Sequence, residues 1–233
     1  AYTNTYGELE ALKRKYEEAL SVSDVVGLVI GTRPDCMPDT LLHYLEEVNK
    51  NTFLLVEYGI ESTHDATLRR INRGHTFQDT VDAVERTVAS GILTGGHVIL
   101  GLPGETHEDL VAQAVTLSRL PITTLKMHQL QLIRGTRMAH EYEQHPEDFH
   151  LFGVEEYIDL VIDYIEHLRP DLVLERFVSQ SPKELLIAPD WGLKNYEFVA
   201  RLQKRMKERG AYQGKKYKDS EKRIIFADDK FTT

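Results

Sequence analysis

Two carboxylates and an arginine-rich turn lie close together in the stretch from Phe53 to Thr76, FLLVEYGIESTHDATLRRINRGHT. Its first half alternates like a β-strand, and alternation sends every second side chain to the same face, so Glu57 and Glu61 point the same way. The opposite face is wholly apolar and suits a covering layer of helices. Because ligands bind at the C-terminal ends of parallel strands in α/β proteins, the pattern predicts a ligand site there. The alternative is that both glutamates are solvated or paired with nearby arginines.

Polar side chains on two later strands are expected to join this site. Strand parity puts His97 on one face of the stretch GGHVILG, and it puts Lys126 and His128 on one face of LKMHQL. If these faces line the same interior as Glu57 and Glu61, polar side chains occupy several levels of the site along the strands. A His/carboxylate cluster suits a metal ion, although no HxH pair stands at a strand end. The alternative is that each histidine is an ordinary hydrogen-bonded core residue.

Signatures of nucleotide or metal binding are sparse. The sequence has no GxGxxG that opens a helix, no GxxxxGK[ST] and no HExxH. The nearest candidate is GLPGET, whose glycines let the backbone approach a ligand and whose Thr106 begins a helix with free N–H groups. A glycine-proline turn between a strand and a helix also forms without any ligand.

Helices and strands are expected to alternate along the chain, because apolar residues recur with helical spacing in some stretches and in short runs or alternation in others. Five strands separated by helices predict parallel βαβ units, hence an α/β protein with a barrel or an open doubly wound sheet. The predicted strands cover residues 25–30 and 53–61, the stretch GILTGGHVIL, and residues 122–133 and 171–179. The predicted helices cover residues 7–20, 38–48, the stretch from Ser62 to the RRINRGH turn, residues 76–90 and 106–119, part of 149–170, and 193–209.

Local signals predict where several elements begin and end. A serine or threonine three residues before an aspartate is the pattern of a capping box, and it occurs three times. The pairs are Ser62 with Asp65, Thr76 with Asp79, and Thr106 with Asp109. The segment RGTRM after the fourth strand is expected to be a loop, and SPKELLIAPDW is expected to be a connection without regular structure.

Length and composition describe an ordinary globular chain. Its 233 residues are 41% hydrophobic, enough for a substantial core, and no apolar run approaches the length of a membrane span. We therefore expect a cytoplasmic protein with no membrane partner. The single cysteine, Cys36, excludes an internal disulfide and any cysteine-based metal site made by this chain alone. The first residue is alanine, so the natural N-terminus is expected to lie upstream.

Charge is unevenly distributed along the chain. The net charge is −9, yet residues 201–223 hold ten lysines and arginines against three acids. This basic tail is either a solvated surface or a contact for RNA or another polyanion. Removing the residues after Gly210 is expected to leave the fold intact, although the apolar Ile224, Ile225 and Phe226 would suit an edge strand.

A family resemblance rests on four motifs and their order. TRPD follows one strand, EYGIES ends the next, INRGHT occupies the following turn and HVILGLPGET ends the strand after that. Together they resemble the radical S-adenosylmethionine (SAM) superfamily, close to oxygen-independent coproporphyrinogen oxidase and the catalytic elongator protein. ERFVSQSPKELLIAP resembles a bacterial family within that branch. The resemblance covers residues 2–191, and residues 192–233 are expected to form a C-terminal helix and the basic tail.

The resemblance implies a partial parallel (β/α) barrel. Such enzymes bind a [4Fe-4S] cluster through a CxxxCxxC loop after the first strand, and an electron donor reduces it. The cluster cleaves SAM, and the 5′-deoxyadenosyl radical abstracts a hydrogen atom from the substrate. This sequence has no such loop, so it resembles a fragment that begins after the second strand, and the chain alone is expected to be inactive and free of a cluster.

The resemblance also implies how SAM would be held. Glu61 stands where relatives carry a polar residue near the methionyl group of SAM. Arg73 matches an arginine that pairs with the SAM carboxylate, which suits a bidentate guanidinium. Glu57 is expected to line the same site, and we expect Glu57, Glu61, Arg73 and His97 to converge at the C-terminal ends of adjacent strands.

The remaining assignments concern the nucleoside part of SAM. Arg33 and Asp35 follow the strand that approaches the ribose. His97 stands where some relatives have an acid, and His128 with Leu130 lies on the strand that approaches adenine. The runner-up hypothesis is a cluster-free β/α module that binds an anionic or nucleotide ligand, or RNA through its basic tail. The substrate is not readable from these residues.

Overall fold

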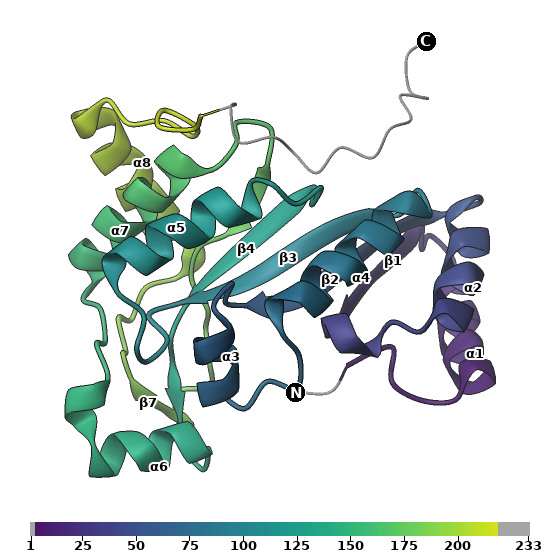
Figure 1. Ribbon diagram of the computed structural model, residues 1–233, viewed down its shortest axis with the longest axis horizontal. Coiled ribbons are helices and arrows are strands. Elements are labelled where there is room, and N and C mark those ends of the chain that lie inside the picture. Colours follow the sequence, from purple (N-terminus) through teal and green to yellow (C-terminus); the bar gives the residue numbers. More distant parts are fainter. Residues whose placement is uncertain (1–2, 219–233) are drawn as a thin grey trace.

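The computed structural model describes residues 3–218, and its centre is a five-stranded parallel sheet (Figure 1). All four strand pairings are parallel, which confirms the expected succession of βαβ units. The order in the sheet is β1 (Gly27–Thr32), β2 (Phe53–Glu61), β3 (Leu93–Leu100), β4 (Thr124–Gln129) and β6 (Val173–Arg176).

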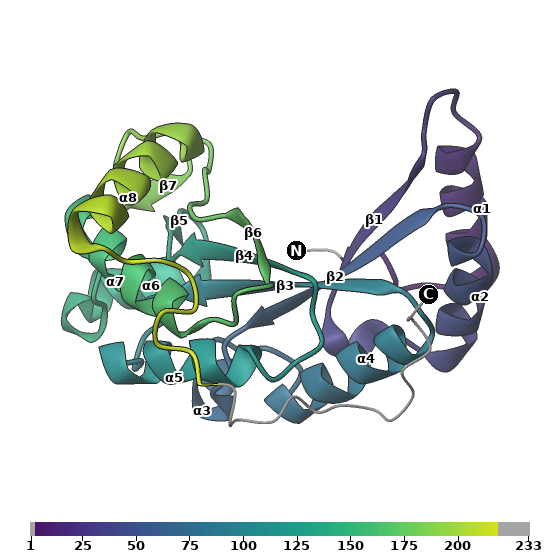
Figure 2. The ribbon, with the colours of Figure 1, turned by 90° about the horizontal axis from the view of Figure 1, so that it is seen from above.

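Helices cover one side of this curved sheet and flank its two ends, and the other side stays open (Figure 2). This arrangement is the α/β partial barrel predicted from the sequence. The longer helices are α1 (Leu9–Leu20), α2 (Asp39–Asn49), α4 (Phe77–Ala89), α5 (His107–Leu117), α7 (Val154–His167) and α8 (Asn195–Arg209). No helix within the described residues is long and apolar enough to cross a membrane.

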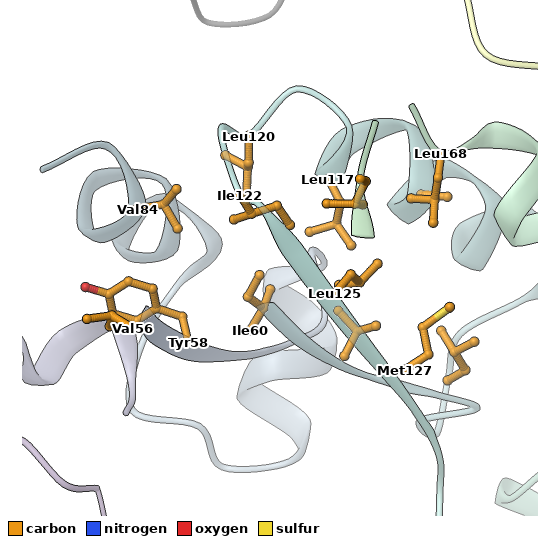
Figure 3. Close-up of a cluster of buried hydrophobic side chains, with 14 of the residues drawn as sticks. Val56, Tyr58, Ile60, Val84, Leu117, Leu120, Ile122, Leu125, Met127 and Leu168 are labelled. Atoms are coloured by element: carbon orange, nitrogen blue, oxygen red, sulfur yellow. The ribbon is translucent and has the colours of Figure 1, made fainter. Parts of the chain in front are cut away.

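The two faces of β2 divide as strand parity predicts. Val56, Tyr58 and Ile60 are fully buried against the helices (Figure 3), and the Tyr58 hydroxyl lies 2.7 Å from Thr87 Oγ1 of α4. The open face is apolar at the start of the strands, where Phe53 is half-exposed, and it becomes charged further along. The alternation therefore places Glu57 on the open face and the core residues on the other.

The capping predictions are confirmed at two helices and wrong at a third. Thr76 and Thr106 each form a reciprocal capping box with the aspartate three residues on. The short helix α3 (Asp65–Arg70) has His64 as its N-cap instead, with no side-chain cap. Ser62 accepts a hydrogen bond from the His64 backbone N–H and donates its own proton to Glu105, so it serves a long-range contact.

The predicted strand over 122–133 is in fact two strands in different sheets. β4 ends at Gln129, whose side chain makes two hydrogen bonds to the Ser179 backbone, of 3.1 and 2.8 Å, and so occupies groups that a further ladder would need. The chain then forms β5 (Leu132–Ile133), which pairs antiparallel with β7 (Leu186–Ala188). β7 lies within the segment that we expected to be an irregular connection.

The segment after β5 is also more ordered than the sequence indicated. RGTRM was expected to be a loop, but Arg137 begins α6 (Arg137–Gln144), and the Thr136 side chain caps it by accepting from the Ala139 N–H. A short 3-10 helix, η2 (Pro146–Asp148), follows. Together with β5 these elements enclose a small second core of Leu102, Leu130, Leu132 and Phe149.

Helix α8 packs on α7 through aromatic rings. Phe198 is fully buried, and its ring centroid lies 5.6 Å from that of Tyr157 and 6.2 Å from that of Trp191. Arginines of α8 are paired with acids of α7: Arg205 Nη1 lies 2.6 Å and Arg209 Nη2 3.0 Å from Asp159 Oδ1. Much of the positive charge in this part of the basic tail is therefore neutralised within the protein.

Residues 211–218 make polar contacts with the rest of the fold, and the expectation that the fold survives removal of the segment after Gly210 stays a prediction. Gln213 Nε2 donates to the carbonyls of Arg169 and Leu172 at 2.9 and 2.7 Å, and Lys216 Nζ lies 2.6 Å from Glu166 Oε2. These contacts fix the chain at the entrance to β6. Ile224, Ile225 and Phe226, the predicted edge strand, lie outside the described residues. The boundary between residues 191 and 192 stays a prediction.

Candidate functional site

A charged cluster crosses the middle of the open face, with one residue from each of four neighbouring strands. His97 Nε2 of β3 lies 3.2 Å from Glu57 Oε2 of β2. Lys126 Nζ of β4 contacts the other oxygen of Glu57, Oε1, and lies 3.0 Å from Glu175 Oε2 of β6. The parallel register places His97 opposite Lys126 and places Gly95 opposite Glu57, so Glu57 and His97 are offset by two residues and meet through their side chains.

The contacts keep Glu57 and Lys126 charged. The close contact with His97, together with the Lys126 ammonium, outweighs burial and lowers the pKa of Glu57 to about 2. For Lys126, burial alone would lower the pKa, but the carboxylates of Glu57 and Glu175 raise it above its usual value. A carboxylate and an ammonium group therefore persist on this face across the physiological pH range.

His128 lies beside this cluster and stays neutral. Its ring meets the His97 ring edge-on with centroids 5.8 Å apart, and its Nε2 is buried without a hydrogen-bond partner among the described residues. Burial, and then the nearby positive groups, lower the pKa of His128 to about 4. A neutral ring with a spare buried nitrogen can donate to or accept from a ligand.

A second charged pair, Glu61 with Arg73, stands at the C-terminal end of β2. A register shift between β2 and β3 and a left-handed backbone at Glu61, with φ of 63°, turn its carboxylate toward Arg73, whose Nη2 lies 3.1 Å from Glu61 Oε1. Arg73 also donates to the Gly59 carbonyl at 2.8 Å. A Cβ built on Gly59 would lie 2.8 Å from Arg73 Nη2, so the glycine makes room for the guanidinium.

The Arg73–Glu61 pair has unused binding capacity. Arg73 Nε is buried and has no hydrogen-bond partner among residues 3–218. Burial raises the pKa of the Glu61 carboxyl, and Arg73 opposes this rise. Buried donors are normally hydrogen-bonded, so this Nε of Arg73 calls for an acceptor. The carboxylate of a ligand bound beside Glu61 would supply that acceptor.

The exit of β1 meets the turn that holds Arg73. Arg33 directly precedes the 3-10 helix η1 (Pro34–Cys36), and its Nε donates to Oδ1 of Asp35 within that helix at 2.9 Å. The Arg33 guanidinium lies over Gly74, since a Cβ built there would be 2.6 Å from its Nη2. These two predicted residues therefore lie next to the Arg73 turn, and they are paired with each other.

His75 was missed in the sequence prediction, although it stands in the INRGHT motif. Its side chain is fully buried, its Nδ1 lies 4.0 Å from Asp35 Oδ1, and neither ring nitrogen has a hydrogen-bond partner in the described part of the chain. Burial, and then Arg73, lower the pKa of His75, so the ring is neutral. The only sequence signal was its place directly after the arginine turn.

The structure brings most of the predicted residues together and leaves one apart. Glu57, Glu61 and His97 lie on the open face of β2 and β3, Arg73 reaches Glu61 from the turn after α3, and His128 adjoins them. The predicted position at the C-terminal ends of the strands holds for Glu61 but is wrong for Glu57 and His97, which stand in the middle of their strands. Leu130 is buried in the second hydrophobic core and offers little surface to a ligand. Their roles in cofactor binding stay predictions.

The structure bears on two further sites that the sequence suggested, a ligand site at GLPGET and a His/carboxylate metal site. In GLPGET, Gly101 has φ of 91°, and a Cβ there would lie 2.8 Å from Phe152, so backbone shape and packing account for this glycine. The helix after it is capped by its own Asp109. As for a His/carboxylate metal site, no three His, Cys, Asp or Glu side chains within residues 3–218 are arranged to hold a metal ion.

A wide hollow of about 1790 Å³ adjoins the site around the outer edge of β1. Its walls come from residues 3–8, from α1, from η1 and from α4. Arg33 and Asp35 lie on the wall that faces the Arg73 turn. The charged pairs of the open face and this hollow are therefore contiguous through η1.

Comparison with known proteins assigns the chain to a family. The radical SAM superfamily model matches residues 1–113, and the Radical_SAM C-terminal domain model matches residues 122–208. The chain belongs to the radical SAM superfamily. It is 37% identical to YtqA of Bacillus subtilis (strain 168) over 92% of this chain and 66% of that protein, and 31% identical to YhcC of Escherichia coli (strain K12) over 90% and 68%. It thus spans about two thirds of the length of these relatives.

A solved structure shares the fold. Elp3 of the archaeon Methanocaldococcus infernus, with its N-terminus deleted, superposes with a TM-score of 0.72 at 20% identity, over 87% of this chain and 46% of that one. In sequence, the chain is also 23% identical to the tRNA uridine(34) acetyltransferase of the same organism, over 86% of this chain and 38% of that protein. The partial barrel predicted from the motifs is therefore confirmed.

Proposed function

We propose that this chain supplies the SAM-binding wall of a radical SAM enzyme. The observation that carries the proposal is the Arg73–Glu61 pair at the end of β2, in which Arg73 keeps a buried Nε without a partner among the described residues. Both side chains lie on the open face of the sheet, at the end of the strands where parallel α/β proteins bind their ligands.

The pair matches the amino-acid end of SAM in charge. The ligand carboxylate would accept hydrogen bonds from the Arg73 guanidinium, a group that binds carboxylates with two parallel hydrogen bonds. The ligand ammonium group would take the Glu61 carboxylate, and its positive charge would offset the burial that raises the pKa of this group. The existing ion pair, at 3.1 Å, places a cation and an anion as neighbours, as a zwitterionic α-amino acid requires.

Other residues would hold the nucleoside end. Arg33 and Asp35 adjoin Arg73 through Gly74 and are assigned to the ribose, while His97 and His128 are assigned to the adenosine side. His128 brings a neutral ring with a spare nitrogen, which suits hydrogen bonding to an uncharged base. These assignments rest on the family resemblance and are supported by the closeness of Arg33 to the Arg73 turn and of His128 to His97.

The second cofactor of the family does not fit the residues of this chain. A [4Fe-4S] cluster needs cysteine thiolates, and the 233 residues contain only Cys36. A cluster held by cysteines outside these residues would supply the electron that cleaves SAM in the proposed enzyme. The likeness to a tRNA uridine(34) acetyltransferase makes a tRNA the first substrate class to test.

The proposal predicts that the chain recognises the amino-acid end of its ligand. In isothermal titration calorimetry, SAM should bind at least about tenfold more tightly than 5′-methylthioadenosine, which keeps the nucleoside and lacks the carboxylate and the ammonium group. The expected ratio follows because a charge-assisted hydrogen bond contributes about 1.5–3 kcal/mol. Equal affinities for the two ligands, or no binding of SAM, would contradict the proposal.

A further inference from the structure

Four side chains form an unbroken line of contacts across the open face, from β6 to β3. Glu175 contacts Lys126, Lys126 contacts Glu57, and Glu57 contacts His97. The order of charge along the line is negative, positive, negative, and then an imidazole. Each member comes from a different strand, so the line joins the far strand of the sheet to the histidine beside the Arg73 pair.

Glu57 is fixed from both ends of its carboxylate. Oε1 meets Lys126 and Oε2 meets His97, and only 8% of the side chain is exposed. Its stem packs against the backbone of β3, since a Cβ built on Gly95 would lie 3.4 Å from Glu57 Cγ. A carboxylate with both oxygens engaged and its stem packed has one orientation available to it.

Lys126 is held in the same way. Its side chain is 17% exposed, and carboxylates flank its ammonium group on both sides. Glu175 reaches this position because the β4–β6 pairing shifts register at Lys126, which skips Glu175 in the ladder. An ammonium group between two carboxylates is compensated, whereas a neutral side chain in its place would leave Glu57 and Glu175 close together without a cation.

We propose that Lys126 is a positioning residue, which acts through Glu57 to hold the His97 ring with its Nε2–H toward Glu57 and its Nδ1 toward the open face. Nε2 is shielded from solvent and has no partner with full hydrogen-bond geometry within residues 3–218, yet it lies 3.2 Å from the Glu57 carboxylate as an electrostatic contact, while the side chain as a whole is 30% exposed. Nδ1 is then an acceptor for a ligand hydroxyl or amino group. The identity of that ligand rests on the proposed function, but the orientation of the ring does not.

The positioning role is distinct from a merely structural one. If the line of charges only stabilised the sheet, loss of Lys126 would change stability without changing the state of the His97 ring. In the positioning account, Glu57 without Lys126 is free to rotate, so the ring loses the contact that sets its proton on Nε2 and its orientation. Arginine at position 126 would keep the cation between the two carboxylates and preserve the ring.

Nuclear magnetic resonance of the histidine side chains tests this inference in the intact chain. With ¹⁵N-labelled histidine, the wild type should show one solvent-protected Nε2–H signal for His97 at neutral pH, assigned by its absence in His97→Gln. The signal should persist in Lys126→Arg and disappear in Lys126→Met. Lys207→Met, on the exposed side of α8, is the matched control and should leave the signal unchanged.

Two results would overturn the inference. One is a wild type without a protected His97 signal, and the other is a folded Lys126→Met chain, by circular dichroism, that keeps it. Should Lys126→Met fail to fold, Glu57→Met gives the second comparison, since it keeps the stem of the side chain, removes both oxygens that could accept from Nε2–H, and so must remove the signal. The readout needs no ligand, so a chain that passes this test and does not bind SAM would refute only the proposed function.

Discussion

Replacing Arg73 by methionine should weaken the binding of SAM by about tenfold to a hundredfold. Methionine keeps much of the stem of the side chain but removes every donor to the ligand carboxylate. The range corresponds to the loss of about 1.5–3 kcal/mol from a charge-assisted contact. Titration calorimetry on the variant and the wild type measures the ratio. Binding of 5′-methylthioadenosine should change far less, because that ligand offers Arg73 no carboxylate.

The matched control is Arg201→Met. Arg201 is half-exposed on α8 and lies 3.6 Å from Glu155, far along the chain and on the helical side of the fold. Its replacement removes the same charge and should leave the affinity for SAM within about twofold of the wild type. An Arg73→Met chain that is folded and binds SAM as tightly as the Arg201→Met chain would refute the role of Arg73.

Replacing Glu57 by glutamine should lower the free energy of unfolding by about 2 kcal/mol at pH 7, and by less in acid. The pKa of Glu57 is about 2 in the folded protein and near 4.5 when unperturbed. A lowered folded-state pKa contributes stability that is fully present above pH 4.5 and is lost as the pH falls toward 2. The size allows for partial solvent screening of the shift.

Urea unfolding followed by circular dichroism measures this difference at pH 7 and pH 3. The difference in the free energy of unfolding between wild type and Glu57→Gln should shrink at pH 3, because the wild type loses there the stability that the ionised Glu57 contributes. Glu10→Gln is the control: Glu10 is an exposed residue of α1 that pairs with Lys13 across one turn, so the stability difference caused by Glu10→Gln should be small at both pH values. A Glu57→Gln difference that is equally large at both pH values would contradict the assignment.

Local patterns predicted the scaffold where neighbours in sequence decide the outcome. The faces of β2 follow from alternation, and the caps at Thr76 and Thr106 are closed by residues three positions away. Ser62 carries the same pattern, yet its hydroxyl serves Glu105, which stands 43 positions later. A local signature is reliable only where no distant partner competes for the same group.

The end of β4 shows the same limit. The stretch from Ile122 to Ile133, with apolar residues spread along it, gives no local reason for a break, so one strand was predicted. The break comes from hydrogen bonds between Gln129 and Ser179, which are 50 positions apart, and from the pairing of β5 with β7. Such pairings depend on tertiary structure that periodicity does not encode.

Strand parity and motif order predicted much of the candidate site. They placed Glu57, Glu61, His97 and Arg73 on one face, which the geometry bears out. The partnership of Lys126 with Glu175 was out of reach, because the register shift between β4 and β6 is not visible in sequence. The missed His75 is buried by packing around the Arg73 turn, and its type alone did not distinguish it from a surface histidine.

The central claim is that SAM binds on the open face with its amino-acid end on the Arg73–Glu61 pair. A crystal structure of this chain grown with SAM tests it most directly. The account predicts the ligand carboxylate within hydrogen-bond distance of Arg73 and the ammonium group at Glu61. SAM bound on the helical side, or bound on the open face while Arg73 keeps only its present contacts to Glu61 and Gly59, would contradict it.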